Sequence, residues 1–544
     1  MSMNNRGTDA PVLREDAVTL PSQSCNRRSL LAGGLGLLGS TLLRTPLRQA
    51  VASAATPNAR QSGLDFASAL EAARAIRRGE VSSVELTSRM LERIERLNPP
   101  LNAIVTLRAD EALARARAAD EARAHGEWWG PLHGVPCTIK DTFATAGVRT
   151  TAGAPSLSAH VPTRDAVVVA RLRAAGMVLL GKTNVPLMAG DWQSYNEIFG
   201  TTNNPWDVTR TPGGSSGGCA AALAAGLTYL SVGSDLGGSI RIPAHFCGVY
   251  GHKPTLNVVP IRGHIPPSPG SPPFPPLSLP VAGPLARSAS DLHAALEVLG
   301  GPDAEEARAY RWSLPPARRS RLSEYRIGFV LDHPLYPVAS DVGEVMAEAV
   351  TALRQAGASV EEGWPPGVLP IHQYDTYLYL LNSVFAAGLP DDRIEQARQR
   401  AANQDGTIQA KRALAWTAPH KHFLAAEDRR IAARAVWQKY FETRDAFLLP
   451  TAFVTAFPHD HSTNVDNRVL TTPNGSRQYS DLLFWISFAT LTGLPATTAP
   501  VGLTREGLPV GIQIIGPYLE DATPIDLAGK LADVLGGFRP PQGY

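Results

Sequence analysis

Apolar residues recur every three or four positions in three successive stretches, residues 66–78, 82–97 and 109–125. This is the period of an amphipathic helix, because side chains three and four positions apart lie on one helix face. Ser82 stands at the start of the second stretch and is of a type that caps helix N-termini. The pattern predicts three helices that cover a larger structure.

Helical and strand patterns then alternate along the chain. A helical period at residues 166–175 ends at Gly176, and four apolar residues, 177–180, follow as in a strand. The later part of the chain predicts helices at 289–299 and 341–356 and strands at 326–331 and 358–361. Alternation of this kind is typical of an α/β fold.

Two glycine-flanked serine clusters are the most distinctive feature of the sequence. Gly213–Gly218 reads GGSSGG, and Gly233–Ser239 reads GSDLGGS. Glycine permits close approach to the main chain, so that successive amide N–H groups can converge on one oxygen, as an oxyanion hole requires. Residues 219–225 predict a helix and 227–232 a buried strand, which would return the second cluster toward the first.

A serine nucleophile needs a base, and no histidine lies between Gly213 and Ser239. The candidate base lies upstream, where a short apolar strand in residues 134–141 carries Lys140 near its end. A lysine that is partly removed from water can be neutral and act as a general base.

Lys140, the GGSSGG cluster and the run DLGGSIRIP at Asp235–Pro243 together resemble the amidase signature family. Malonamidase, fatty acid amide hydrolase and the A subunit of glutamyl-tRNA amidotransferase belong to this family. The resemblance extends from about residue 64 to about residue 538 and is weakest between about 305 and 416. It implies an α/β/α domain whose large, mixed and twisted central sheet is covered by helices on both faces.

The resemblance also implies a reaction, the hydrolysis of carboxylic acid amides to an acid plus an amine or ammonia. A Ser-Ser-Lys triad would carry it through an acyl-enzyme intermediate. By this likeness Ser239 is the nucleophile, Ser215 is the bridging serine after a cis Gly214–Ser215 peptide bond, and Lys140 is the base.

The same likeness supplies the remaining residues of the site. The backbone amides of the oxyanion hole would belong to Leu236, Gly237, Gly238 and Ser239, and Ser216 would hydrogen-bond Lys140. Asp235 and Arg241 would hold the loop through their opposite charges. In relatives the segment after residue 365 shapes the substrate entrance, which makes Tyr374, Tyr377, Tyr379 and Phe385 candidates for the pocket, although core packing is the more common role.

The N-terminal segment has the pattern of an export signal. Arg27 and Arg28 precede an apolar, glycine-rich run at residues 32–43, and A-x-A cleavage sites follow. This resembles a bacterial twin-arginine signal peptide, and the run is short for a membrane span. The alternative is an ordinary first helix with an arginine pair. We expect residues 1–54 to be the signal and 55–544 the amidase domain of a periplasmic or secreted protein, with no stable membrane insertion after processing.

Charge and composition limit the partners. The chain has 51 basic and 49 acidic residues, a net charge of +2, which provides no field to attract nucleic acid. A small-molecule amide fits better, and no cofactor is implied. The three cysteines beyond the leader, Cys137, Cys219 and Cys247, are expected in the core. The sequence leaves the oligomeric state open, a homodimer included.

Other motifs compete with this interpretation. Gly213–Gly217 also matches the G-x-S-x-G nucleophile elbow, but the preceding residues are polar and twice interrupted by proline, whereas an elbow follows a strand. Residues 176–183 match a phosphate-binding loop, yet they predict a strand where that loop would be open. Histidine pairs at 420/422 and 459/461 lack further ligands, so we expect no metal site.

Two other classes of function remain. An amidotransferase A-type subunit would use the same triad to release ammonia for a tRNA-bound partner, but it would be cytosolic, and the leader argues against it. A catalytically inactive binding protein would keep the fold and lack the triad, whereas all three residues are present.

Overall fold

Eleven strands form one sheet in the part of the chain that this computed structural model describes, residues 63–269, 278–386, 388–403 and 406–544. Their order is β1-β3-β2-β6-β8-β7-β14-β15-β11-β9-β10, with both parallel and antiparallel neighbours. The strands are β1 (Ile104–Leu107), β2 (Pro136–Lys140), β3 (Val178–Thr183), β6 (Leu230–Asp235), β7 (Tyr250–Lys253), β8 (Val281–Ala286), β9 (Arg326–Phe329), β10 (Ser359–Glu362), β11 (Ala446–Pro450), β14 (Ala496–Leu503) and β15 (Pro509–Ile515). Two small hairpins pair β4 (Tyr195–Asn196) with β5 (Gly200–Thr201) and β12 (Val469–Thr472) with β13 (Gly475–Gln478).

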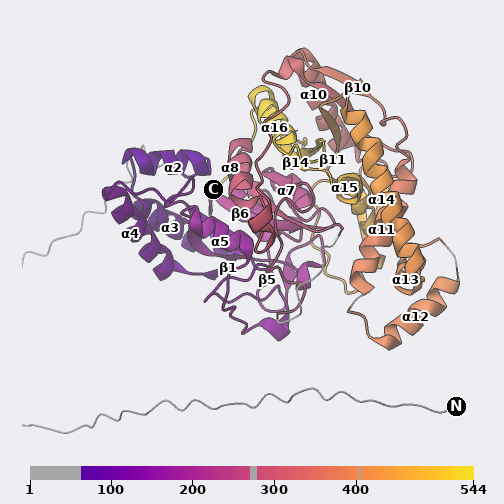
Figure 1. Cartoon of the computed structure of the whole chain (residues 1–544), viewed down its shortest axis with the longest axis horizontal. Helices are drawn as coiled ribbons and strands as arrows, with labels where there is room; N and C mark the ends of the chain where they lie inside the picture. The colour runs from indigo at the N-terminus through magenta and orange to yellow at the C-terminus, as the bar shows by residue number, and fades with distance from the viewer. Residues whose placement is uncertain (1–62, 270–277, 387, 404–405) are drawn as a thin grey trace, which may run out of the picture. The chain divides into compact units, whose positions relative to one another are not determined.

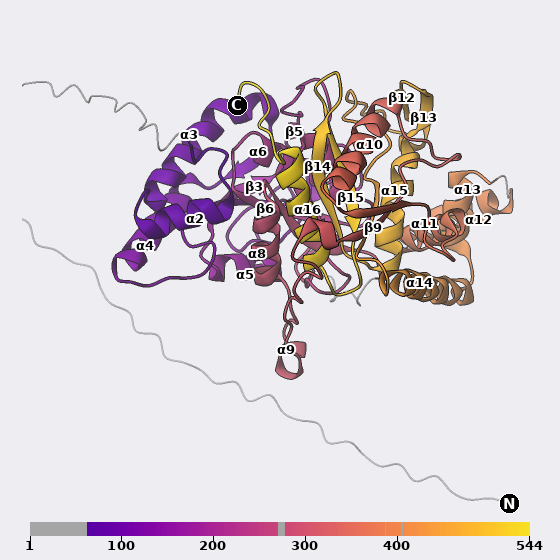
Figure 2. The same cartoon turned by 90° about the horizontal axis from the view of Figure 1, so that it is seen from above.

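Helices cover both faces of this sheet (Figures 1 and 2). The α-helices are α2 (Ala69–Arg78), α3 (Ser83–Leu101), α4 (Ala109–Ala124), α5 (Val167–Ala174), α6 (Gly217–Ala224), α7 (Arg241–Cys247), α8 (Ala289–Leu299), α9 (Glu306–Ala309), α10 (Ser340–Gln355), α11 (Pro370–Ala386), α12 (Asp391–Ala402), α13 (Ile408–Thr417), α14 (His420–Phe441), α15 (Leu482–Thr492) and α16 (Ala522–Leu535). Helices α8, α10 and α16 pack on β8 and β14, and α6 and α7 pack on β6 and β15. Figure 1 shows α11 and α14 side by side with α15.

The centre of the sheet is buried on both sides. β2 lies between β3 and β6 and is parallel to both, and every residue of β2 and β3 is buried. Helices cover both faces of such strands, so most of their residues are apolar, and the polar ones, such as Lys140 and Lys182, are buried with them. The fold is therefore the mixed α/β/α arrangement that the sequence predicts.

The structure confirms the first three helices but moves some of their boundaries, and α2 begins at Ala69 rather than at residue 66. Ser82 caps α3 in a capping box with Glu85, as its residue type predicts. Helix α3 does not end at residue 97 but continues through Pro99 and Pro100 to Leu101. Both prolines are exposed, so water can satisfy the carbonyl groups that would otherwise bond to their missing N–H groups.

The strand predicted at 227–232 is displaced. The observed β6 begins at Leu230 and continues through Ser234 to Asp235. Apolar pattern alone cannot predict polar residues inside a buried strand. They are tolerated here because both find polar partners in the site described below.

The described residues fall in one compact unit, Pro57–Tyr544. The segment predicted to be an export signal, 1–54, lies outside them. Cys137, Cys219 and Cys247 are buried and unpaired, as expected. Among the helices that the structure describes, none is both long and apolar enough to cross a membrane.

Candidate active site

The parallel pairing of β2 with β6 brings the predicted groups together. Thr138 lies opposite Ser231 and Ile139 opposite Val232, so both strands end at the same edge of the sheet. Lys140 is the last residue of β2, and Asp235 is the last residue of β6. The carboxyl ends of parallel strands are where open α/β sheets bind ligands.

Lys140 is fully buried and surrounded by hydroxyl groups. Its Nζ lies 2.7 Å from Ser215 Oγ and 3.0 Å from Ser234 Oγ, with the Ser234 carbonyl oxygen at 3.5 Å. Burial lowers the pKa of this lysine from 10.5 to about 7, because the charged form loses its hydration. A large fraction of the amine is therefore neutral near neutral pH and able to accept a proton.

The two glycine-flanked clusters meet beside Lys140. The Gly214–Ser215 peptide bond is cis, as the resemblance implies. The Ser216 amide donates a hydrogen bond to the Ser239 carbonyl oxygen at 3.1 Å, which joins the two clusters through the main chain. No hydrogen bond joins the Ser215 and Ser239 hydroxyls in the described part of the chain. Catalytic hydrogen bonds often align only once substrate is bound, so this leaves the predicted relay open.

The predicted contact of Ser216 with Lys140 is wrong. The Ser216 hydroxyl donates instead to the Ser234 carbonyl oxygen at 3.4 Å. Ser216 is the N-cap residue of α6, and the next two residues are glycines whose close packing sets the path of this turn. A Cβ on Gly218 would lie 2.5 Å from the Asn184 nitrogen, so only glycine fits there. Ser234, from the other cluster, takes the place beside the lysine.

One of the predicted oxyanion donors is already engaged. The Gly238 amide donates to Asp235 Oδ1 at 3.0 Å, and Gly238 has a φ of 89°, which favours glycine. The amides of Leu236, Gly237 and Ser239 donate to no group among the residues that the structure describes. These three are the remaining candidate donors.

Two aromatic side chains hold the carbonyl groups of this loop. Tyr377 donates its hydroxyl hydrogen to the Leu236 carbonyl oxygen at 3.1 Å, and Trp192 donates its indole N–H to the Gly237 carbonyl oxygen at 2.7 Å. In a trans peptide the N–H points opposite to the C=O of the same plane. Fixing these two carbonyl groups therefore fixes the directions of the Gly237 and Gly238 N–H groups.

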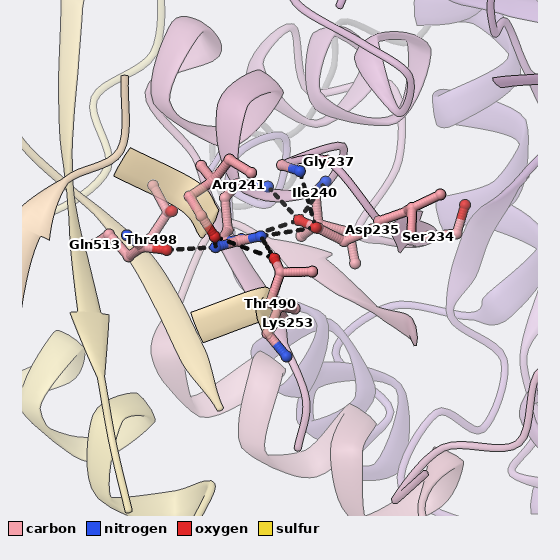
Figure 3. A network of polar contacts seen from close by, with 12 residues as sticks. Ser234, Asp235, Gly237, Ile240, Arg241, Lys253, Thr490, Thr498 and Gln513 are labelled. Atoms are coloured by element: carbon pink, nitrogen blue, oxygen red, sulfur yellow. Dashed lines mark hydrogen bonds and ion pairs between the residues drawn. The ribbon is translucent and has the colours of Figure 1, made fainter. Parts of the chain in front are cut away.

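The predicted pairing of Asp235 with Arg241 is confirmed, and both side chains are fully buried. Figure 3 shows the Arg241 guanidinium between Asp235, Thr490 and Gln513. Burial alone would raise the pKa of the Asp235 carboxyl, but the charge and hydrogen bonds of Arg241 hold it below its usual value. The ionised carboxylate also accepts from the Ile240 amide at 3.1 Å, so the pair fixes the turn that carries Ser239.

A cavity of about 460 Å³ opens onto Ser239. Its charged lining residues are paired: Arg412 contacts Asp466 at 2.8 Å, and Asp191 contacts Arg468 at 2.7 Å. Apolar side chains supply much of the wall, namely Trp192, Leu236, Leu378, Leu381, Phe385, Ile408, Trp416, Val465 and Leu483. Lys140 and Ser215 are buried and do not line it.

The four aromatic residues predicted as pocket candidates lie in different places. Phe385 lines the cavity, and Tyr377 holds the loop from behind. Tyr374 is buried in the core, and Tyr379 lines a separate hollow. A larger hollow of about 800 Å³ involves α2, α8 and α16 but contains none of the predicted catalytic residues.

The histidine pairs are not arranged as ligands. His420 and His422 lie in the first turn of α14, where residues two apart do not share a face. His461 stacks on Tyr195 with ring centroids 3.8 Å apart. Among the described residues, no group of three or more histidine, cysteine or acidic side chains could hold a metal ion.

Sequence reasoning missed Ser234 and His264. Ser234 Oγ lies between Lys140 Nζ and the His264 Nε2 atom, 2.8 Å away. A parallel alignment of the two strands could have placed Ser234 beside Lys140, because it stands one residue before the end of β6. His264 lies in a proline-rich segment without periodicity, and no sequence signal pointed to it.

The comparisons with known proteins agree on one family. A family model described as Amidase matches residues 85–524. The A subunit of glutamyl-tRNA(Gln) amidotransferase from Thioalkalivibrio sulfidiphilus is 35% identical over 499 residues, which cover 87% of this chain and 98% of the relative. A solved structure described as an amidase is 30% identical with a TM-score of 0.69, and the match covers 86% of this chain and 100% of that one. The structure of a 6-aminohexanoate cyclic dimer hydrolase with substrate is 28% identical with a TM-score of 0.68, and the match covers 88% and 99% of the two chains.

Proposed function

Because this chain belongs to the amidase family, we propose that it hydrolyses carboxylic acid amides through Lys140, Ser215 and Ser239. The observation that carries the proposal is the 2.7 Å contact between the buried Lys140 amine and the Ser215 hydroxyl, close to the loop that presents Ser239 to the cavity. A desolvated amine beside a hydroxyl is the arrangement that activates a serine nucleophile.

The proposed reaction has two halves. Ser239 Oγ forms a bond to the amide carbon while its proton passes to Ser215, whose own proton passes to the Lys140 amine. The tetrahedral intermediate collapses, the C–N bond breaks, and the leaving amine receives the proton from Lys140 by the same path. Water then attacks the acyl carbon and gives a proton to Lys140 by the same path. The bond from the acyl carbon to Ser239 Oγ breaks, the proton returns from Lys140 through Ser215 to Ser239 Oγ, and the acid is released.

The developing oxyanion needs donors that are already oriented. The amides of Leu236, Gly237 and Ser239 are proposed to supply them, since Gly238 is committed to Asp235. Losing one such donor typically costs 10²–10³ in rate. The Tyr377 contact supports this role for Gly237, because it fixes the peptide plane that carries the Gly237 N–H group. The Trp192 contact fixes the next plane, whose N–H group is the one committed to Asp235.

The cavity supports neutral substrates with an apolar acyl or amine part. Its charged residues neutralise each other in pairs, and Trp192, Phe385 and Trp416 offer aromatic surface. A neutral amide would not need to break an ion pair to enter. Hydrophobic pockets with few polar groups commonly bind such ligands.

The test is a panel of aryl, alkyl and peptide amides with the purified chain. We expect hydrolysis of neutral amides with a rate that falls below about pH 7, where Lys140 becomes protonated. A fluorophosphonate should form its adduct on Ser239, and mass mapping of the peptide would identify the residue. An adduct on Ser215 or Ser216 would contradict the assignment and favour the nucleophile elbow.

A second candidate is an amidotransferase A-type subunit, which releases ammonia from an amide for a tRNA-bound partner. The curated relative, the A subunit of a glutamyl-tRNA(Gln) amidotransferase, supports this candidate more directly than the first. The paired charges of the cavity favour a neutral amide over glutamine. Glutaminase activity that rises on adding the other subunits of such an amidotransferase would decide for the second candidate.

Export is a separate part of the proposal. Arg27, Arg28 and the apolar run at 32–43 support removal of residues 1–54 after twin-arginine export to the periplasm or medium. Changing both arginines to lysine should retain the precursor in the cytoplasm. Undiminished recovery of that variant outside the cytoplasm would contradict the proposal.

A further inference from the structure

We propose that His264 is a positioning residue for the reaction put forward above. Through Ser234 it sets the direction of the hydrogen bonds around Lys140, so that the lone pair of the amine faces Ser215. The inference rests on the proposed function, but it concerns a residue outside the triad and outside the cavity.

The backbone holds His264 over the end of β2. The Ala144 amide donates to the Gly263 carbonyl oxygen at 2.8 Å, and the Ile265 amide donates to the Thr142 carbonyl oxygen at 2.7 Å. Two main-chain hydrogen bonds, one on each side of His264, therefore tie its loop to the residues just after Lys140.

The side chain of His264 is also held in place. Its ring makes an edge contact with Phe143, with centroids 5.0 Å apart. Gly263 has a φ of 91°, and a Cβ there would lie 2.6 Å from the Ala166 Cα. Only glycine therefore allows the loop to pass so close to Ala166. The imidazole is thus presented to Ser234 by a fixed segment.

The partners of the ring determine its tautomer. His264 Nδ1 lies 3.0 Å from the Pro266 carbonyl oxygen, and a carbonyl can only accept, so Nδ1 carries the hydrogen. Burial lowers the pKa of His264 to about 4, which keeps the ring neutral at neutral pH. Nε2 then has no hydrogen and must accept the one from the Ser234 hydroxyl, 2.8 Å away.

The hydrogen bond from Ser234 to His264 also determines how Ser234 contacts Lys140. Ser234 has a single hydroxyl hydrogen, and His264 accepts it, so Ser234 Oγ can only accept from Lys140 Nζ at 3.0 Å. A second N–H of the neutral amine points toward the Ser234 carbonyl oxygen at 3.5 Å. A neutral amine has two N–H bonds and one lone pair, and the lone pair is left facing Ser215 Oγ at 2.7 Å.

Without the histidine acceptor, the directions of the hydrogen bonds around Lys140 are no longer fixed. The Ser234 hydroxyl could rotate and donate its hydrogen to Lys140 Nζ, where it would compete with Ser215 for the lone pair. The base would then be occupied by the wrong hydroxyl. Because His264 does not line the cavity, substrate binding should be unaffected and the loss should fall on the chemical step.

The test compares His264→Leu with His264→Gln. Gln can place an acceptor oxygen near the Nε2 position, whereas Leu fills space without accepting. We expect His264→Leu to slow fluorophosphonate labelling and to lower kcat by about tenfold or more, with KM changed less than about twofold. His264→Gln should recover most of the rate. Added to Ser234→Ala, His264→Leu should cause no further loss, because the relay is already cut.

A second measurement is made on the wild-type protein, and a variant serves only to assign the resonances. In wild-type protein labelled with ¹⁵N-histidine, the His264 resonances, assigned by their loss in His264→Gln, should show a neutral ring protonated at Nδ1. A ring protonated at Nε2 would overturn the inference, as would wild-type labelling by His264→Leu. Equal losses in the Leu and Gln variants would also overturn it, because they would indicate a structural role. A wild-type protein that neither labels nor hydrolyses any amide would instead remove the proposed function itself.

Discussion

Two lysines are buried on neighbouring strands of the sheet, Lys140 on β2 and Lys182 on β3. The strands pair in parallel, with Lys140 opposite Thr183 and Ile139 opposite Lys182. Burial lowers the pKa of both amines, to about 7 for Lys140 and about 8 for Lys182. By residue type, burial and pKa, either one could be the base.

The hydrogen-bond partners distinguish them. Lys182 Nζ donates to the Phe143 carbonyl oxygen and lies 3.0 Å from each of Thr145 Oγ1 and Thr150 Oγ1. Each threonine gives its own hydrogen to a carbonyl, on Phe143 and Val148 respectively. All three partners can therefore only accept, and an ammonium group with three N–H bonds satisfies them all.

Lys140 has one partner of a different kind. In the described part of the chain Ser215 Oγ has no hydrogen-bond partner other than Lys140 Nζ, so its hydrogen is free to be donated. This is what a base requires and what Lys182 lacks. The direction of its hydrogen bonds, more than its burial, therefore distinguishes a candidate base from a structural cation.

The largest expected effect is on catalysis. Lys140→Met should lower amide hydrolysis by about 10²–10⁴-fold, the usual contribution of a general base, while the protein stays folded. Steady-state rates and thermal denaturation would check this. Wild-type activity with the same acid limb would require another base.

The matched change, Lys182→Met, should lower the free energy of unfolding rather than the rate of hydrolysis. Lys182→Met leaves Thr145 Oγ1 and Thr150 Oγ1 without a donor and removes one donor from the Phe143 carbonyl oxygen, which keeps the Thr145 hydroxyl. It should cost about 3–5 kcal/mol of unfolding free energy in urea denaturation at pH 7. The rate per folded molecule should stay within a few-fold of wild type. A large loss of rate in a fully folded Lys182→Met protein would erase the distinction between the two sites.

Both lysines should also make stability depend on pH, in an unusual direction. In the folded protein the pKa values of both lysines lie below the ordinary value of 10.5. Between about pH 8 and 10 the unfolded chain therefore binds more protons than the folded one, and the free energy of unfolding rises with pH. Each lysine contributes roughly 1 kcal/mol per pH unit in this window, which opens near pH 7 for Lys140 and near pH 8 for Lys182. Urea denaturation across this range should show a smaller slope in each methionine variant. Unchanged slopes would contradict the lowered pKa values.

The smallest effect is expected at Ser216. Its hydroxyl donates to the Ser234 carbonyl oxygen rather than touching Lys140, so Ser216→Ala should slow fluorophosphonate labelling by less than about threefold. A loss as large as that of Lys140→Met would place Ser216 in the proton path and restore the contact that the sequence predicts.

The sequence predicts Lys140, both serine clusters and the Asp235–Arg241 pair, because each belongs to a short local pattern. It cannot predict the contact of His264 with Ser234, which joins segments 30 positions apart through space. The displacement of β6 has a related cause, since Ser234 and Asp235 extend the strand only because Lys140 and Arg241 satisfy them. Local periodicity predicts which faces are apolar, but it cannot predict such polar contacts between distant residues.

Helix α11 belongs to the part of the chain where the family resemblance is weakest, and it lines the cavity with Leu378, Leu381 and Phe385. The same helix supplies Tyr377, which holds the Leu236 carbonyl group. Under the proposed function, side chains that contact the substrate and a side chain that holds the oxyanion loop therefore lie on one helix. Grafting α11 from a relative with another substrate would exchange both kinds of side chain at once, and such a chimera would need Tyr377 retained before its new specificity could be expressed at a useful rate.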